Sequence, residues 1–148
     1  MEHLFSFFQN KILWTSILAW FIAQAIKVVL VFIKHKKIDF TRMIGSGGMP
    51  SSHSSFSVSL AMSTGLSHGF NSTIFAMCFC FALIVMYDAA GVRRSAGEQA
   101  KILNKIVEEW EQGDFSHTDI KLKELLGHTP FEVFAGAVLG VVISLIFF

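Results

Sequence analysis

Long apolar runs constrain the fold of this chain more than any other feature of its sequence. Residues 12–33, 73–87 and 131–148 are almost entirely apolar, and the second of these runs reaches spanning length when residues 71–88 are counted. A helix needs about 20 such residues to cross the hydrocarbon core of a bilayer. Because lipid offers no hydrogen bonds to the backbone, an apolar segment of this length crosses as a helix. The runs therefore predict an all-α integral membrane protein.

A fourth, weaker run covers residues 56–66 and extends back to Pro50 through a small Ser-rich turn. We therefore expect about four transmembrane helices that form a single membrane-embedded domain over residues 1–148. Composition supports this class, because 53% of the residues are hydrophobic, only 16% are charged, and the 16 Phe exceed what a small soluble core needs. The first run is too long for a removable signal peptide and lacks its cleavage site, so we expect it to remain as a helix.

The only long polar stretch, residues 91–127, contains a helix of a second kind. Over residues 95–110 the apolar residues form one stripe and the Lys and Glu residues lie elsewhere. This pattern predicts an amphipathic helix along the membrane interface. Gly113 and Asp114 interrupt the pattern, and residues 118–126 are expected to form a second short helix that ends at Gly127.

Basic residues are concentrated in two of the connections between the apolar runs. They are Lys34, Lys36, Lys37 and Arg42 after the first run, and Arg93, Arg94, Lys101, Lys105, Lys121 and Lys123 after the third. The turn at residues 68–72 has no Lys or Arg, and the N-terminal segment has only Lys11. The positive-inside rule then places both basic connections in the cytoplasm and both termini outside the cell membrane. The net charge of +1 gives no indication of a nucleic-acid partner.

Two histidines stand at the predicted starts of helices. His128 lies in Leu126-Gly127-His128-Thr129-Pro130-Phe131-Glu132, and His53 ends Met49-Pro50-Ser51-Ser52-His53. Residues four apart share a helix face, so Glu132 is expected to orient the ring of His128, as a nucleophile or a base requires. Helix N-termini also favour phosphate. These features predict a phosphoryl site, whereas the other four histidines lie in termini or connections and are expected to be solvated.

Charged and polar residues within the apolar runs have two interpretations. Gln24 and Lys27 share a helix face, and such residues usually point into the bundle and are functional. Alternatively, Lys27 snorkels to the cytoplasmic surface. Asp88 is either an accessory catalytic group or the partner of Arg93 or Arg94 in an interfacial ion pair.

Two pairs of smaller residues also need an interpretation. Ser51 and Ser52 either contact phosphate or only cap their helix. Cys78 and Cys80 are two apart on the third run, so they face different sides and suggest buried packing rather than a disulfide or a metal site.

Together these residues resemble a known family. The three blocks that carry the resemblance are Gly47-Gly48-Met49-Pro50-Ser51-Ser52-His53, Asp88-Ala89-Ala90-Gly91-Val92-Arg93-Arg94 and Leu126-Gly127-His128-Thr129-Pro130-Phe131-Glu132-Val133. With Gln24-Ala25-Ile26-Lys27-Val28, they are similar to the divergent branch of the type 2 phosphatidic acid phosphatase family, which is related to acid phosphatases and vanadium haloperoxidases. The resemblance covers nearly the whole chain.

The resemblance implies a phospho-histidine intermediate. We expect no metal or other cofactor, because the carboxylates are too scattered to form a metal cage, with a magnesium site at Asp88 and Glu132 as the alternative. His128 resembles the nucleophile, and Glu132 stands at the spacing where the family commonly has an Asp. His53 resembles the acid that protonates the leaving oxygen. The groups that would contact phosphate oxygens are Lys27, Ser51, the backbone N–H of Ser52, and Arg93 or Arg94.

Two departures from the family pattern are visible. The family places its arginine a few residues before the nucleophilic histidine, whereas the long polar segment separates Arg94 from His128. The family's Lys shortly before Arg-Pro is also absent as such, and Lys27 is the residue that we assign in its place.

The sequence therefore predicts a membrane lipid-phosphate phosphatase. Its substrate would be phosphatidylglycerol phosphate, phosphatidic acid or a polyprenyl phosphate, bound at the cytoplasmic face. The alternative is a non-catalytic membrane protein that binds anionic lipid or phosphate through the same basic pocket. Four short helices also leave open a homo-oligomer, in which a second copy helps to enclose the site.

Overall fold

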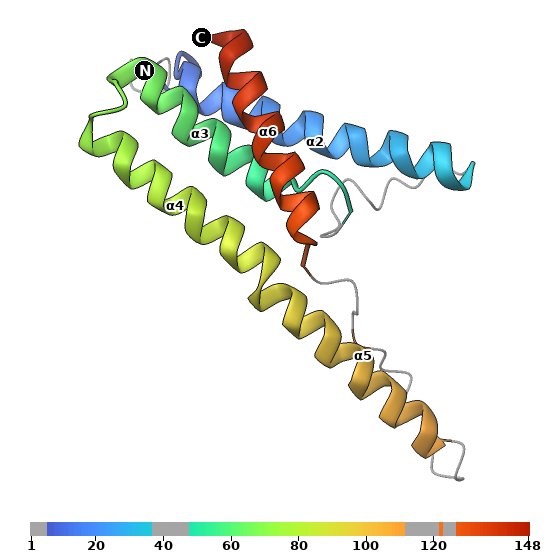
Figure 1. Cartoon of the computed structure of the whole chain (residues 1–148). Coiled ribbons are helices and arrows are strands. Elements are labelled where there is room, and N and C mark those ends of the chain that lie inside the picture. Colours follow the sequence, from blue (N-terminus) through green and yellow to red (C-terminus); the bar gives the residue numbers. More distant parts are fainter. Residues whose placement is uncertain (1–5, 37–47, 112–121, 123–126) are drawn as a thin grey trace.

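The computed structural model describes residues 6–36, 48–111, 122 and 127–148, and these residues form helices without any strand. The helices are α2 (Lys11–His35), α3 (Ser52–His68), α4 (Thr73–Ala90), α5 (Val92–Glu111) and α6 (Pro130–Phe147) (Figure 1). The all-α membrane fold predicted from the apolar runs is therefore confirmed. The basic residues Lys37 and Arg42, and most of the short helix predicted for residues 118–126, lie outside the described residues.

The helix starts follow from side chains that cap them. Asn10, Ser51, Ser72 and Thr129 each accept a hydrogen bond from a backbone N–H in the first turn of the helix that follows. Such caps satisfy backbone donors that have no partner inside the helix. The start of each of these four helices is thus set locally by its sequence.

Helix α3 lies at the centre of the bundle and packs against α2, α4 and α6. Three stretches of helix are long and apolar enough to cross a membrane, namely Lys11–Ile33, Thr73–Glu108 and Pro130–Phe147, and α3 is not one of them. Serine and threonine occupy many of its positions, and most of these side chains are buried. Because its neighbours surround it, α3 contacts protein more than lipid and does not need the apolar surface of an exposed span.

Small residues allow α3 and α6 to approach closely. A side chain at Gly136 would collide with the backbone of Ser51, and a Cβ at Gly140 would lie 2.5 Å from the carbonyl oxygen of Ser55. One helical turn further along, the hydroxyl of Ser144 meets those of Ser59 and Ser63 at 3.0 and 3.1 Å. Close backbone contact and hydrogen bonds between helices are the main sources of helix association in lipid.

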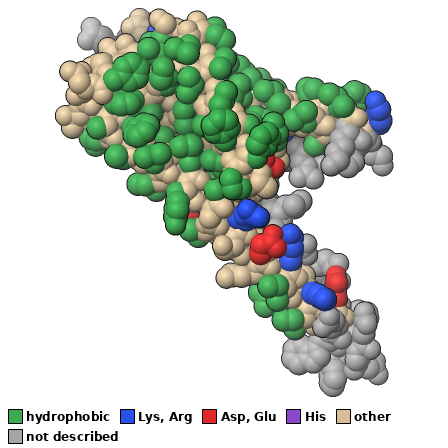
Figure 2. All heavy atoms as spheres, in the orientation of Figure 1, with side chains coloured by type: hydrophobic (Ala, Val, Ile, Leu, Met, Phe, Trp, Pro, Cys, Tyr) green, Lys and Arg blue, Asp and Glu red, His purple; other side chains and the backbone are tan. Residues whose placement is uncertain are grey.

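The outer surface of the bundle is apolar, and the charged side chains in Figure 2 lie mainly on α5, which projects from the bundle. Exposed residues include Met77 and Ile84 on α4, and Phe131, Phe134 and Ile146 on α6. An apolar surface of this extent matches a lipid environment. Cys78 is half-buried beside Thr64, but Cys80 is exposed on the same surface, so the prediction that both cysteines are buried was wrong for Cys80.

Helix α5 continues from α4 across Gly91 and extends away from the bundle (Figure 1). The predicted helix of residues 95–110 is therefore present and begins a few residues earlier. The side-chain amide of Asn104 forms two hydrogen bonds of 2.9 Å with the backbone of Leu122, which fixes part of the returning connection against α5.

Candidate active site

The candidate site lies where the starts of α3 and α6 meet the end of α4. The backbone N–H of Ser51 donates to the carbonyl of Glu132 at 2.9 Å, and that of His128 donates to the carbonyl of Ala89, also at 2.9 Å. Gly127 has a φ of 89° and its Cα faces the backbone of the first turn of α5, where any side chain would collide. Glycine at this position therefore lets the segment with His128 reach the end of α4.

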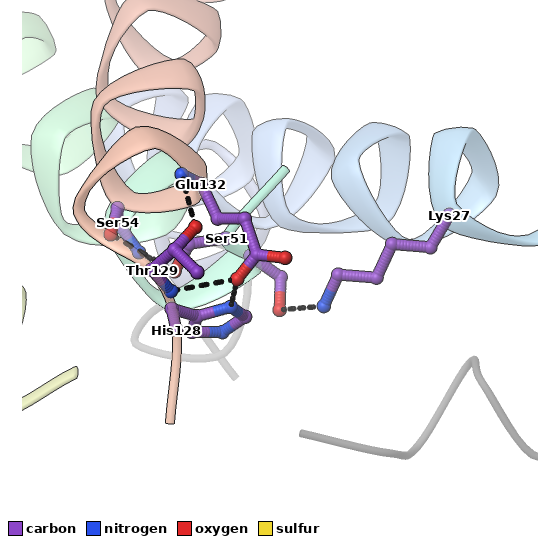
Figure 3. Close-up of polar contacts among 7 residues, drawn as sticks. Lys27, Ser51, Ser54, His128, Thr129 and Glu132 are labelled. Atoms are coloured by element: carbon purple, nitrogen blue, oxygen red, sulfur yellow. Dashed lines mark hydrogen bonds and ion pairs between the residues drawn. The ribbon is translucent and has the colours of Figure 1, made fainter. Parts of the chain in front are cut away.

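His128 and Glu132 form the pair that their spacing predicts. The ring Nδ1 of His128 lies 3.3 Å from Oε2 of Glu132 (Figure 3). The same carboxylate oxygen accepts the backbone N–H of Thr129 at 2.9 Å, while the hydroxyl of Thr129 accepts the N–H of Glu132. This capping box fixes the carboxylate at the helix start, and the carboxylate in turn fixes the imidazole ring.

The second ring nitrogen of His128 has different surroundings from the first. The side chain of His128 is buried, and its Nε2 has no hydrogen-bond partner among the described residues. Buried polar atoms normally have a partner, so this nitrogen is a candidate for contact with a ligand. With Nδ1–H donated to Glu132, Nε2 carries the lone pair of the neutral ring.

Burial lowers the pKa of His128 below its usual value, and the nearby charge of Lys27 lowers it further, against the opposing effect of Glu132. The protonated ring is poorly solvated at this position, which favours its neutral form. The lone pair on Nε2 is therefore the favoured state of this nitrogen.

His53 faces His128 across the site. It lies in the first turn of α3, and the centroids of the two rings are 6.5 Å apart with an angle of 59° between the planes. The two rings therefore lie close enough for one ligand at the helix mouths to contact both of them.

Lys27 reaches the site from the middle of α2. Its side chain is only 3% exposed, and its Nζ donates to the hydroxyl of Ser52 at 3.3 Å (Figure 3). The alternative in which Lys27 snorkels to the surface does not agree with this position. Gln24, one turn earlier, is also buried.

Ser51 serves as the cap of α3. Its hydroxyl accepts from the backbone N–H of Ser54 at 3.3 Å and from the hydroxyl of Ser54 at 3.0 Å. Of the two serines singled out in the sequence, Ser51 is thus engaged in the helix start, and Ser52 is the one in contact with Lys27.

The two arginines occupy different places. Arg93 forms an ion pair with Asp88, and both side chains line a cavity of about 230 Å³ together with His53. Arg94 is exposed at the start of α5, and it is its backbone that lies against Gly127. The structure thus gathers Lys27, Ser52, His53, His128 and Glu132, adds Asp88 and Arg93 on the side of His53, and leaves Arg94 further out.

The serine row on the inner face of α3 was missed from the sequence. Ser51, Ser55, Ser59 and Ser63 recur every four residues, which is the spacing of one helix face. All four are buried against neighbouring helices. This spacing was a signal in the sequence, and with it the central position of α3 could have been predicted.

Comparisons with known proteins match most of the chain. The family model described as "Divergent PAP2 family" matches residues 8–143 of the chain. An uncharacterized membrane protein of Bacillus subtilis, YuiD, is 44% identical over 147 residues that cover 93% of this chain and 93% of that protein. No solved structure shows a significant match.

Proposed function

Because the chain belongs to the divergent PAP2 family, we propose that it is a membrane phosphatase that hydrolyses a lipid phosphate through a phospho-histidine. One observation carries the proposal. The buried Nε2 of His128, whose ring is oriented by a carboxylate, has no partner among the described residues, and the ring centroid of His53 lies 6.5 Å from that of His128.

In the first step, the lone pair on Nε2 of His128 forms a bond to phosphorus while the bond from phosphorus to the ester oxygen breaks. His53, in its protonated form, gives its proton to that oxygen, so the lipid leaves as a neutral alcohol. Glu132 stabilises the positive charge that develops on the His128 ring.

In the second step, water attacks phosphorus and the bond between phosphorus and nitrogen breaks. His53 is now neutral and takes the proton of the water, so it returns to its starting state. The products are inorganic phosphate and free enzyme, and no oxidant or further reactant is needed.

Cationic groups would stabilise the charge on the transferred phosphoryl group. Lys27 stands on the side of His128, where its ammonium contacts Ser52. Of the two arginines we assign the clamp to Arg93, because it shares a cavity with His53. In this assignment, the phosphate replaces Asp88 as the partner of the guanidinium, whose planar fork suits phosphate oxygens.

The substrates that we propose are phosphatidylglycerol phosphate, phosphatidic acid and polyprenyl phosphates, each of which presents a phosphate at the membrane surface. We place the site on the cytoplasmic face because the exposed basic residues Arg93, Arg94, Lys101 and Lys105 follow α4 directly.

Turnover of purified protein on these lipid phosphates tests the proposal, with His128→Ala as the blank. Release of inorganic phosphate by the wild-type protein alone, together with label from a ³²P-lipid on His128, supports it. Label on a serine or aspartate instead would contradict the mechanism.

The split third motif and the Asp88–Arg93 ion pair favour a second candidate, a protein that binds anionic lipid without turnover. Saturable binding of all three lipid phosphates without any release of phosphate would support this alternative.

A further inference from the structure

A second cavity opens beside His53, on the outer face of α3 between α2 and α4. It has a volume of about 350 Å³. Apart from His53 it is lined by Ile17, Trp20, Phe56, Ser57, Phe81 and Val85. His53 and Val85 also line the smaller cavity that holds Asp88 and Arg93. The two cavities therefore meet at His53, with charged groups on one side and apolar groups on the other.

The chemistry of this groove suits hydrocarbon. Its walls are aromatic and aliphatic, and Ser57 already donates its hydroxyl to the backbone of Ser54. Outside His53 the indole N–H of Trp20 is the remaining side-chain donor of the lining. Burial of an apolar chain is therefore the main favourable interaction that the groove offers a ligand.

The proposed reaction indicates which part of the substrate the groove would bind. His53 protonates the ester oxygen of the leaving alcohol, and the groove extends from His53 to Phe81, about two helical turns before Ala89, whose carbonyl accepts the N–H of His128. The leaving alcohol is also the part of a lipid phosphate that carries the chain.

Resting on the proposed function, we infer that the groove between α2 and α4 binds one hydrocarbon chain of that leaving alcohol. Small-ligand pockets span about 300–1,000 Å³, and a groove near the lower limit suits one chain rather than two.

A series of alkyl phosphates from ethyl to dodecyl, used below their micelle concentrations, tests the inference by turnover. Burial of one methylene contributes up to about fourfold in kcat/KM, so kcat/KM should rise with chain length and level off when the groove is full. Val85→Phe narrows the groove and should remove most of this rise. The matched control is Val138→Phe, at an exposed position of α6 outside both cavities, and it should keep the rise.

Quenching of Trp20 gives a readout that does not need turnover. The chain has three tryptophans, and with Trp14→Phe and Trp110→Phe only the one in the groove remains. A bromoalkyl phosphate should quench its fluorescence saturably, and Val85→Phe should weaken this binding at least tenfold, whereas Val138→Phe should not. Ethyl phosphate should not compete in the same concentration range.

The outcomes distinguish the inference about the groove from the proposed phosphatase activity. Saturable quenching without phosphate release would support the groove and reject the proposed phosphatase. Turnover with a flat chain-length series, or equal behaviour of Val85→Phe and Val138→Phe in both measurements, would reject the groove and leave the phosphatase in place.

Discussion

At the scale of single residues, the candidate site combines local and distant contacts around His128. Glu132 holds one ring nitrogen and a backbone N–H with the same oxygen. Lys27 and His53 approach from two other helices. The proposed chemistry requires His128 to be neutral and oriented, and each of these neighbours affects one of the two properties.

Replacement of Glu132 by Gln should lower kcat by about 10²–10⁴-fold, because an amide neither fixes the same tautomer nor stabilises the charged ring. The fold should be retained, since Gln also occupies this position in capping boxes. Steady-state kinetics and a thermal unfolding curve in detergent check both statements. A kcat within about twofold of wild type would remove Glu132 from the mechanism.

The pH dependence should reflect the lowered pKa of His128. Activity requires a neutral His128 and a protonated His53, so kcat/KM should depend on pH with an acid and a basic limb. The acid limb, which reflects His128, should lie below the ordinary histidine pKa of about 6.5. The charge of Lys27 contributes to this lowering. Lys27→Met should therefore move the acid limb of the profile to higher pH. A limb that stays in place, or moves to lower pH, would contradict the assignment.

The two arginines form a matched pair for a test of the phosphate clamp. Arg93→Lys should raise KM and lower kcat/KM by at least tenfold, because an ammonium cannot replace the planar fork on phosphate. Arg94→Lys should change little, because Arg94 is exposed outside the cavity that Arg93 lines. Equal tolerance of both changes would argue that neither arginine makes a bidentate contact.

At the scale of helices, the contact between α3 and α6 positions the two histidines relative to each other. Gly136 and Gly140 let α6 lie directly on the backbone of α3, and the N–H of Ser51 donates to the carbonyl of Glu132 at the mouth of the contact. Any increase in the distance between these helices would therefore separate His53 from His128.

Gly140→Ala should destabilise the protein by about 1–3 kcal/mol, as overpacking of a close contact does. In an isolated helix the same change stabilises by about 1 kcal/mol, so the sign distinguishes the two effects. The new Cβ would lie 2.5 Å from the carbonyl oxygen of Ser55, a backbone atom that cannot rotate away. Val138→Ala on the exposed side of α6 is the control. Denaturation in detergent measures both, and a stabilised Gly140→Ala variant would contradict the close contact.

At the scale of the whole molecule, three of the four helices of the bundle present apolar surface to lipid and enclose the serine-rich fourth. The site lies at one end of this bundle, next to the basic start of α5. Orientation in the membrane therefore decides whether the site meets cytoplasmic or external substrates.

Labelling of single-cysteine variants tests the orientation of the protein in the membrane. In a background without Cys78 and Cys80, Asn71→Cys on the turn before α4 and Glu98→Cys on α5 are both exposed. Positive-inside bias predicts that a membrane-impermeant thiol reagent labels position 71, and not position 98, in intact cells. The reverse pattern would place the site on the outer face.

The sequence by itself determined what depends on neighbours along the chain. The apolar runs predicted the membrane helices, and the spacing of four residues placed Glu132 beside His128, because helix geometry alone fixes that contact. Contacts between distant residues were decided only by the tertiary structure. Ser144 pairs with serines 81 and 85 positions away, and Lys27 meets Ser52 across 25 positions, through the packing of separate helices. The same packing encloses α3, placed Arg93 rather than Arg94 beside His53, and formed the groove between α2 and α4, since each depends on which helix faces meet.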